Sequence, residues 1–539
     1  MPSTEAIVAS IHDLQDGEKQ PVKVGETEVL LIRHNGRYFA IAAHCTHYKA
    51  PLAEGVLSGD HIVCPWHNAY FNITTGDQQE PPGLDSLPRY EVKIDGDKVI
   101  VSVPEDAAPT RTRSMAKYDA NADHRTFVIL GAGAAGAHAA ETLRVANFQG
   151  RIIMATQDDR LPYDRTRLSK DYFNGKVSRE QMPLRSAEFY HDHDIEVWLN
   201  KPAVRVDAQT KTMQFADGDT LSYDALLLAT GGKPRQLEVP GAELQNVLTL
   251  RSFSDCDRIL AAAKTATQAV VIGSSFIGME AAAGLAQQGV KVTVVSPDAV
   301  PFEKTLGHEI GSVFQQVHEE QGVAFQLGRK VDRLEGSGKV EAAILDTGGS
   351  FASRSVRLPA DLVIVGIGVQ PATEFVNGVE RHAKDHSIST NDYLQAADGL
   401  YAAGDIARYP DWRTGESIRV EHWRIAAQQG RIAAYNMMGK PTKFRAVPMF
   451  WTMQFKFPLR YVGHAEQWDE LIVDGNLQDR QFIAFYVKDN QVLAAATSQR
   501  DTETAAISEL MRLDQMPTPD KLRSGINVVE YLTRSLKEP

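Results

Sequence analysis

The sequence predicts a multidomain protein with an all-β domain first, two α/β domains in the middle and an α+β domain at the end. Three observations support this prediction. The chain has 539 residues, more than one hydrophobic core usually supports. Short alternating strands with turn signals fill residues 1–104, whereas strand–turn–helix units begin near residue 125. Beyond residue 440, strands such as "RQFIAFYVKDNQVLAAAT" mix with helical ends.

The chain is acidic, with a net charge of −12 from 57 Lys and Arg against 69 Asp and Glu. Nucleic acid and anionic membranes are disfavoured as partners, because both need a basic surface that displaces counterions. No apolar run reaches the ~20 residues that span a bilayer, and the N-terminus lacks the basic and apolar regions of a signal peptide. We therefore expect a cytoplasmic protein with no membrane partner and no nucleic-acid partner.

The expected all-β domain contains two hairpin signals. The segments "VLLIRHNGRYFAIAA" and "YEVKIDGDKVIVSV" carry them at Asn35-Gly36 and Asp95-Gly96. A polar stretch without an apolar period follows, and residues 105–122 are expected to be a linker. A flexible linker of about 18 residues would reach roughly 5–6 Å × √18, or about 23 Å. That reach would let the all-β domain leave its neighbours and meet a partner.

Four candidate metal ligands lie in this domain. Cys45 and His47 form a C-x-H pattern, and Cys64 and His67 form C-x-x-H, with sixteen residues between the pairs. The residue types allow a structural zinc site, two unrelated hairpin tips, or a 2Fe-2S cluster with both thiolates on one iron and both imidazoles on the other. The flanking Thr, Pro, Trp and aromatic residues of "CTHYKAPL" and "CPWHNAYFNITTGD" resemble the Rieske cluster motif. That resemblance implies a Rieske 2Fe-2S domain at residues 1–104.

The Rieske resemblance also indicates a subtype. High-potential members carry a further cysteine in each loop and a hydroxyl residue that donates to a cluster sulfur. The corresponding loop positions here hold Ala50 and Trp66, and "HNAY" lacks the serine. Fewer donors stabilise the reduced, more negative cluster less, so we expect a potential toward the low end of the family range, roughly −150 mV. The domain resembles a Rieske ferredoxin.

A G-x-G-x-x-G pattern at Gly131, Gly133 and Gly136 follows the apolar strand "TFVIL" and opens an alanine-rich helix. Glycines there let a pyrophosphate approach the free N–H groups of a helix N-terminus, where the dipole favours anions. The segments "LLLATGGKPR" and "GLYAAGDIARYP" lie where flavoproteins with two dinucleotide sites contact FAD, although each could also be a tight turn. The predicted Rossmann-like, FAD-binding domain spans residues 123–240 and 373–440.

Individual FAD contacts follow from these motifs. The Asp405 carboxylate would accept hydrogen bonds from the ribityl chain. Gln157 stands in "MATQDD" where an acid for the ribose is expected, so Asp158 is the predicted substitute. The other predicted contacts in these motifs are Ala229, Thr230, Gly231 and Gly404.

Three further segments, "RLPYDRTRLSKDYF", "RVEHWRIAAQQGRIAAYNM" and "VPMFWTMQF", extend the pattern over nearly the whole chain. They resemble the ferredoxin reductase and apoptosis-inducing factor flavoproteins, and above all their Rieske-fused branch, the apoptosis-inducing-factor-3-like proteins. The resemblance implies a reductase-type C-terminal domain at residues 441–539.

The same resemblance assigns roles to single residues. Lys170 would lie beside the flavin and pair with Glu280, although a surface ion pair contributing about 0–1 kcal/mol is the simpler interpretation. Trp423 would lie near the flavin and nicotinamide rings, although an aromatic core residue would look similar. These three are the predicted catalytic residues, and all three are also predicted cofactor contacts. Further predicted contacts are Arg165, Glu421 and His422.

The second dinucleotide site, in residues 241–372, departs from the pattern twice. Its turn has Gly273 and Gly278, but Ser275 replaces the middle glycine and puts a Cβ near the pyrophosphate. In "VTVVSPDAV", Ser296 stands where an NAD-preferring site normally has an acid for the ribose hydroxyls, and no arginine follows to hold a 2′-phosphate. We expect NADH as the hydride donor, with NADPH as the alternative. The remaining predicted contacts are Ile277, Glu280 and Gly368.

Two other chemistries are disfavoured. Flavin disulfide reductases need a redox-active cysteine pair, and no cysteine lies between residues 125 and 255. Cys256 stands alone and is expected to be buried. A terminal Rieske oxygenase would need an iron held by two histidines and a carboxylate, but "HDHD" at residues 191–194 is more simply a solvated turn.

We expect electrons to pass from NADH through FAD to the fused cluster and on to an unidentified one-electron acceptor protein, for which an oxygenase is one candidate. The alternative is a redox-controlled interaction protein, in which NADH binding changes shape or oligomeric state, a homodimer included, and NADH oxidation is incidental. Nothing in the sequence identifies the acceptor.

Overall fold

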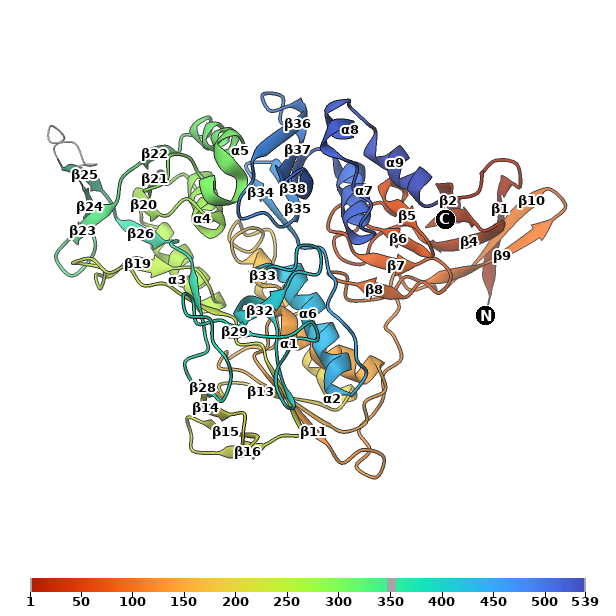
Figure 1. Cartoon of the computed structure of the whole chain (residues 1–539), viewed down its shortest axis with the longest axis horizontal. Coiled ribbons are helices and arrows are strands. Elements are labelled where there is room, and N and C mark those ends of the chain that lie inside the picture. Colours follow the sequence, from red (N-terminus) through yellow and green to blue (C-terminus); the bar gives the residue numbers. More distant parts are fainter. Residues whose placement is uncertain (1, 347–354, 538–539) are drawn as a thin grey trace.

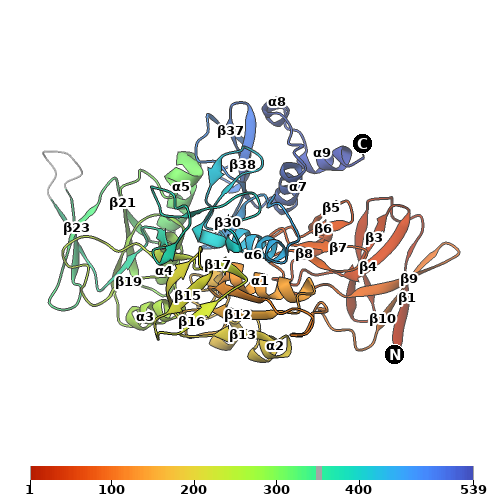
Figure 2. The ribbon, with the colours of Figure 1, turned by 60° about the horizontal axis from the view of Figure 1, so that its bottom comes forward.

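The computed structural model of the chain describes residues 2–346 and 355–537. Figure 1 shows the N-terminal β domain at one end, the α/β unit that contains α4 and α5 at the other, and the C-terminal strands β34–β38 between them. The other α/β unit, around α1 and α6, lies below this centre. Figure 2, turned by 60°, again places the N-terminal domain and the α4–α5 unit at opposite ends.

The N-terminal domain contains a six-stranded sheet, β1-β10-β9-β4-β3-β2, and a four-stranded sheet, β5-β6-β7-β8. Asn35 and Gly36 form the β3–β4 turn with φ values of 51° and 71°, as predicted. Asp95 still pairs across the second hairpin, so that turn is Gly96-Asp97, one residue later than predicted. The strands are β1 (Ser3–Ser10), β2 (Lys19–Val24), β3 (Thr27–His34), β4 (Arg37–Ala42), β5 (Val56–Ser58), β6 (His61–Val63), β7 (Tyr70–Asn72), β8 (Gln78–Glu80), β9 (Arg89–Asp95) and β10 (Lys98–Pro104).

The first α/β unit has the sheet β13-β12-β11-β17-β31-β30, in which the first five strands are parallel. Helices α1 and α6 pack closely, because a Cβ on Gly430 would meet the Ala135 carbonyl oxygen at 2.0 Å. The main elements are β11 (Thr126–Leu130), α1 (Ala134–Val145), β12 (Arg151–Ala155), α2 (Ala187–Asp192), β13 (Ile195–Trp198), β17 (Ala225–Leu228), β30 (Gln395–Ala397), β31 (Leu400–Ala402) and α6 (Trp423–Met437). Smaller sheets add β14 (Ala203–Asp207), β15 (Thr212–Phe215), β16 (Thr220–Ser222), β18 (Gly232–Pro234), β27 (Val369–Pro371), β28 (Val376–Asn377), β29 (Ile388–Ser389), β32 (Ala407–Pro410) and β33 (Ser417–Ile418).

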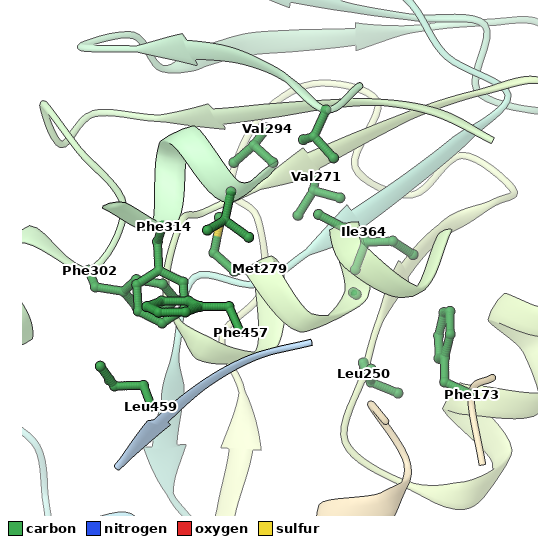
Figure 3. Packing of buried hydrophobic residues seen from close by; sticks show 14 of the residues in the cluster. Phe173, Leu250, Val271, Met279, Val294, Phe302, Phe314, Ile364, Phe457 and Leu459 are labelled. Carbon is green, nitrogen blue, oxygen red and sulfur yellow. The ribbon is translucent and has the colours of Figure 1, made fainter. Parts of the chain in front are cut away.

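The second α/β unit has five parallel strands in the order β19-β26-β20-β21-β22. Its core continues into the C-terminal domain, since Phe457 of β35 packs beside Phe302 and Phe314 (Figure 3), with the Phe314 and Phe457 ring centroids 4.9 Å apart. The elements are β19 (Val247–Thr249), α3 (Phe253–Ala263), β20 (Gln268–Ile272), α4 (Phe276–Gln287), β21 (Lys291–Ser296), α5 (Glu303–Glu319), β22 (Ala324–Leu327), β23 (Val331–Glu335), β24 (Ala342–Leu345), β25 (Val356–Pro359) and β26 (Leu362–Val365).

The C-terminal domain has the antiparallel sheet β34-β35-β38-β37-β36 followed by three helices, which is the predicted α+β class. One apolar cluster joins it to the N-terminal domain and contains Val63 and Tyr70 together with Val462 and Ile507. The elements are β34 (Met449–Gln454), β35 (Phe457–Gly463), β36 (Glu470–Asn476), β37 (Gln481–Lys488), β38 (Gln491–Ser498), α7 (Asp501–Arg512), α8 (Pro519–Arg523) and α9 (Val528–Ser535). Among the described residues, every helix is too short or too polar to cross a bilayer.

The segment expected to be a linker, residues 105–122, lies along its neighbours. Arg111 and Ser86 exchange two backbone hydrogen bonds of 2.9 Å, and the Ala116 N–H donates to the Arg144 carbonyl at 2.9 Å. The β domain itself is docked through the shared apolar cluster. In this structure, therefore, the 23 Å reach calculated for a flexible tether is not used.

Candidate functional site

The four predicted metal ligands come together from two loops with nearly the same backbone. The Cys45 N–H donates to an alanine carbonyl at 2.9 Å, and the Cys64 N–H makes the same bond in the second loop. In each loop the cysteine carbonyl accepts from a left-handed residue, Lys49 (φ 58°, 3.0 Å) or Asn68 (φ 53°, 3.1 Å). Two matching tight turns therefore present the C-x-H and C-x-x-H ligands to a common centre.

The four side chains form two like pairs. The Nδ1 atoms of His47 and His67 lie 3.0 Å apart, and the thiols of Cys45 and Cys64 share a hydrogen bond. Desolvation lowers the pKa of His47 to about 4 and holds the pKa of His67 well below its usual range, so both imidazoles are neutral, as metal ligands must be. In the part of the chain that the structure describes, no three His, Cys, Asp or Glu side chains surround a position for a single ion. Two separate pairs fit the two irons of a 2Fe-2S cluster.

The first glycine turn leaves space at the N-terminus of α1. A Cβ on Gly131 would meet the Ala229 carbonyl oxygen at 2.2 Å, and one on Gly136 would meet the Gly131 carbonyl oxygen at 1.9 Å. Both glycines are therefore needed for packing. Among the described residues, a Cβ on Gly133 would meet nothing within 4 Å, and no side chain caps the helix there. This open helix N-terminus fits the pyrophosphate of FAD.

The other predicted FAD contacts lie around this turn. Asp405 is paired with Arg251, whose Nη2 lies 2.6 Å from Oδ2. Asp158, just beyond β12, accepts from the Tyr163 hydroxyl at 3.2 Å and lies 3.5 Å from Arg165 Nη2. Each predicted acid thus has a cationic neighbour. The turn after β17 and the one at the end of β31 contribute the remaining positions, Ala229, Thr230, Gly231 and Gly404.

The predicted pair of Lys170 and Glu280 forms, and the surface ion pair interpretation is wrong. Glu280 is 4% exposed, and the Lys170 Nζ lies 2.8 and 2.9 Å from its two carboxylate oxygens. Thr452 donates to Glu280 Oε1 at 2.7 Å, and Ser169 donates to Oε2. Charge-assisted hydrogen bonds from three residues hold the carboxylate in place beside a cavity of about 480 Å³ that Lys170 also lines.

The start of α6 carries Glu421, His422 and Trp423 next to one another. Burial lowers the pKa of His422 to about 3, so the ring is neutral, and its Nδ1 has no partner among the described residues. Glu421 is paired with Arg419. Trp423 lines a second cavity, of about 140 Å³, together with His47 of the first ligand loop. A buried nitrogen without a partner fits a contact to a bound cofactor.

The second glycine turn repeats the packing of the first. A Cβ on Gly273 would meet the Gly366 carbonyl oxygen at 2.3 Å, and one on Gly278 would meet the Gly273 carbonyl oxygen at 2.3 Å. Ser275, in the middle position, donates to the Gly366 carbonyl at 3.3 Å. Its hydroxyl therefore turns away from the helix N-terminus. The other predicted contacts here are open to solvent or to free space: Ile277 and Gly368.

Strand β34 contacts both the predicted cluster ligands and Glu280, which no sequence motif indicated. The Trp451 ring lies 4.1 Å from the His67 ring and 5.9 Å from the His47 ring, measured between centroids. Thr452, the next residue, bonds Glu280 on the opposite face. The segment "VPMFWTMQF" contributed only to the family resemblance, although strand alternation predicts opposite directions for neighbouring side chains.

Two buried arginines dock the second ligand loop, and no sequence signal indicated them. Arg424 is 2% exposed and donates to the Asn68 carbonyl at 2.9 Å and the Pro81 carbonyl at 3.1 Å. The Arg460 Nε donates to the Trp66 carbonyl at 2.9 Å. Their acceptors are backbone groups more than 300 residues away in sequence, so they could not be found before the fold was known.

The residues considered for the two disfavoured chemistries make other contacts. His191 is a solvent-exposed residue of α2, and His193 bonds a carbonyl of the same helix. Cys256 is fully buried, and its thiol donates to the Leu168 carbonyl at 3.2 Å.

The fold and these sites define a flavin- and pyridine-nucleotide-dependent oxidoreductase with a Rieske domain. Residues 125–430, more than half of the chain, match the pyridine nucleotide-disulphide oxidoreductase family, so the chain belongs to that family. Residues 4–91 match the Rieske [2Fe-2S] domain and residues 449–525 the reductase C-terminal domain. Its cofactors are FAD and a 2Fe-2S cluster, with NADH as the hydride donor.

Similar proteins include apoptosis-inducing factor 3 of Homo sapiens, which is 39% identical over 518 residues covering 94% of this chain and 84% of the relative. Putidaredoxin reductase of Pseudomonas putida is 31% identical over 402 residues, or 73% of this chain and 93% of the relative. The structure of the covalent putidaredoxin reductase–putidaredoxin complex matches with a TM-score of 0.71 at 30% identity, covering 77% of this chain and 99% of the other. The chain is therefore an oxidoreductase of ferredoxin reductase type.

Proposed function

We propose that this chain passes electrons from NADH through FAD to its own Rieske cluster within the docked assembly, and from there to a one-electron acceptor protein. FAD supplies the conversion of a two-electron hydride into single electrons, and the cluster supplies a one-electron carrier. The observation that carries the proposal is the position of β34. Its Trp451 contacts the cluster ligands, while its Thr452 bonds Glu280 on the other face.

The packing makes a swinging β domain unnecessary for the internal step. Trp423 and His47 line the same cavity of about 140 Å³. Arg424 and Arg460 hold the second ligand loop by its carbonyls, so the distance between the two sites is set by buried contacts. Arg424 and Arg460 thus position the ligand loop relative to the α/β units. The ion pair of Lys170 and Glu280 lies at the other face of β34.

Two hydroxyls near the ligand loops support a low cluster potential. The Thr46 hydroxyl donates to the Asp85 carbonyl at 2.8 Å, and the Tyr70 hydroxyl donates to Glu509. Because both donors are engaged elsewhere, neither is free to bond a cluster sulfur and raise the potential. A cluster at the low end of the Rieske range suits reduction of a further carrier.

The acceptor is proposed by similarity. The reductases of Pseudomonas putida and Rhodococcus erythropolis are named for putidaredoxin, rhodocoxin and a benzene dioxygenase system. We therefore place a ferredoxin or an oxygenase component downstream of this chain, with its own cluster as the last internal carrier.

Replacing His67 with Ala tests the route, because it removes one iron ligand while the α/β units keep their own cores. The purified variant should lose its iron, about two per chain in the parent protein, and the low average g value given by histidine ligation. NADH should still bleach the flavin at nearly the parental rate, and a small dye should still turn over. Cytochrome c reduction should fall at least about tenfold.

The matched control is His61→Ala, since His61 lies in the same domain and its Nδ1 bonds the Ser58 carbonyl at 3.2 Å. It should keep iron and cytochrome c reduction. One zinc per parental chain, or undiminished cytochrome c reduction by the iron-free variant, would contradict the proposed route.

A further inference from the structure

Ser296 cannot take the place of the missing ribose acid, because it is buried. It ends β21, the strand after the second glycine turn, and its side chain is 1% exposed. Its Oγ accepts from the Ser274 hydroxyl at 2.8 Å and from the Asp298 N–H at 3.3 Å. A hydroxyl enclosed in this way does not reach a ribose at the open edge of the sheet.

An acid lies two residues further on. The Asp298 side chain is 25% exposed, and its Oδ2 accepts from Ser296 Oγ at 3.4 Å. The Asp298 carbonyl accepts from the Gly328 N–H at 3.1 Å, which fixes the backbone. Two hydroxyls in series, of Ser274 and Ser296, thus connect the glycine turn with the Asp298 carboxylate and orient it.

The charged groups around Asp298 come from the first turn of α5 and from the segment after β22, and they include Glu303, whose Oε2 accepts from the Ala299 N–H at 2.8 Å. Lys304, in the first turn of α5, has its Nζ 3.0 Å from Asp298 Oδ1 and is 81% exposed. The Arg329 N–H donates to the Ser296 carbonyl at 3.1 Å, while its guanidinium bonds the Asp346 carbonyl at 3.2 Å. An exposed ion pair is weak and screened, so the lysine can exchange Asp298 for another anion. The structure thus places the Lys304 ammonium beside the Asp298 carboxylate.

We propose that Asp298 supplies the ribose acid of this site and that Lys304 sets how strongly NADPH is rejected. The carboxylate accepts hydrogen bonds from the 2′- and 3′-hydroxyls of NADH at the end of the second strand, where this fold places the ribose. It repels a 2′-phosphate, whereas Lys304 attracts one, so discrimination is a balance of the two. The inference rests on the hydride donor binding at the Gly273–Gly278 turn, and it does not depend on the route to the cluster.

The test compares Asp298→Asn and Lys304→Gln in the holoenzyme. With a small dye as acceptor, Asp298→Asn should lower kcat/KM for NADH about tenfold, or about 1.4 kcal/mol, and raise it for NADPH, because the bound ribose loses a charged hydrogen-bond acceptor. Lys304→Gln should lower kcat/KM for NADPH about fivefold and leave kcat/KM for NADH within about twofold of the parent. Calorimetric titration with ADP-ribose and 2′-phospho-ADP-ribose should show the same changes in affinity without turnover.

Two further variants separate Asp298 from its surroundings. Glu309→Gln removes an exposed carboxylate from α5 and should change neither nucleotide preference nor affinity. Ser296→Glu should lower the melting temperature without raising the preference for NADH, because the new carboxylate would be buried. The proposal is overturned by an Asp298→Asn variant with parental preference and ADP-ribose affinity, or by a Ser296→Glu variant that is stable and more selective for NADH. Since the dye takes electrons before the cluster, a failure of the proposed electron route would leave these readouts unchanged.

Discussion

The two ligand loops share one backbone design but differ in what holds them. In the first loop the left-handed residue, Lys49, is exposed, and the neighbouring Tyr48 donates to Asp164 at 3.1 Å beside the FAD-type unit. In the second loop the left-handed residue, Asn68, is fully buried, and its carbonyl accepts from Arg424. Local sequence thus builds the same turn twice. The second loop is the anchor of the β domain, because its buried carbonyl is bonded by Arg424, whereas the first loop makes a more exposed contact through Tyr48.

The largest effect is expected from the anchor. Arg424→Met would remove the donors of the Asn68 and Pro81 carbonyls and leave both acceptors buried without a partner. We expect a loss of about 3 kcal/mol in the free energy of unfolding, measured in urea, and faster proteolysis within residues 105–122 as the β domain undocks.

Arg534→Met is the control, because this arginine of α9 is 75% exposed, and the free energy of unfolding should change by less than about 0.5 kcal/mol. If Arg424→Met also changed the free energy of unfolding by less than about 0.5 kcal/mol, the second loop would not be the anchor of the β domain.

An intermediate effect is expected at Trp451, which contacts the histidines of both loops. Trp451→Leu should lower the free energy of unfolding by about 1–2 kcal/mol and shift the cluster g values, because His67 loses an aromatic neighbour that orients its ring. Trp451→Phe should restore most of the stability. A Leu variant with parental g values would show that the backbone loops alone orient the histidines.

The smallest effect is expected in the first loop. Tyr48→Phe removes only the hydrogen bond to Asp164 and keeps the ring stacked on His47 at 3.8 Å. Thermal unfolding should show a loss of about 0.5–1 kcal/mol, with unchanged iron content and g values. A larger loss than that of Arg424→Met would reverse the order of the two loops.

The candidate site was predictable wherever the chemistry requires particular residues at short spacing. The four predicted Rieske ligands and the glycines of both turns are of this kind, because each motif lies within a short stretch of the chain. The roles of Trp451 and Thr452 could not be predicted from their segment. They depend on contacts with His67 and Glu280, which come from other parts of the chain. Ser296 stands at the strand end where the motif places an acid, but its side chain is buried, and burial cannot be seen in a motif.

By itself, the sequence determined the order of the units, the cofactors and the ligand loops, because strand alternation, glycine turns and ligand spacing are local properties of the chain. Only the tertiary structure decided that the cluster domain is docked, that Glu280 is buried and that β34 contacts both His67 and Glu280. The physical reason is that docking depends on burial and on single hydrogen bonds such as that of Arg424 to the Asn68 carbonyl. Any buried carbonyl can accept such a bond, so no residue type in the sequence indicates where the bond will form.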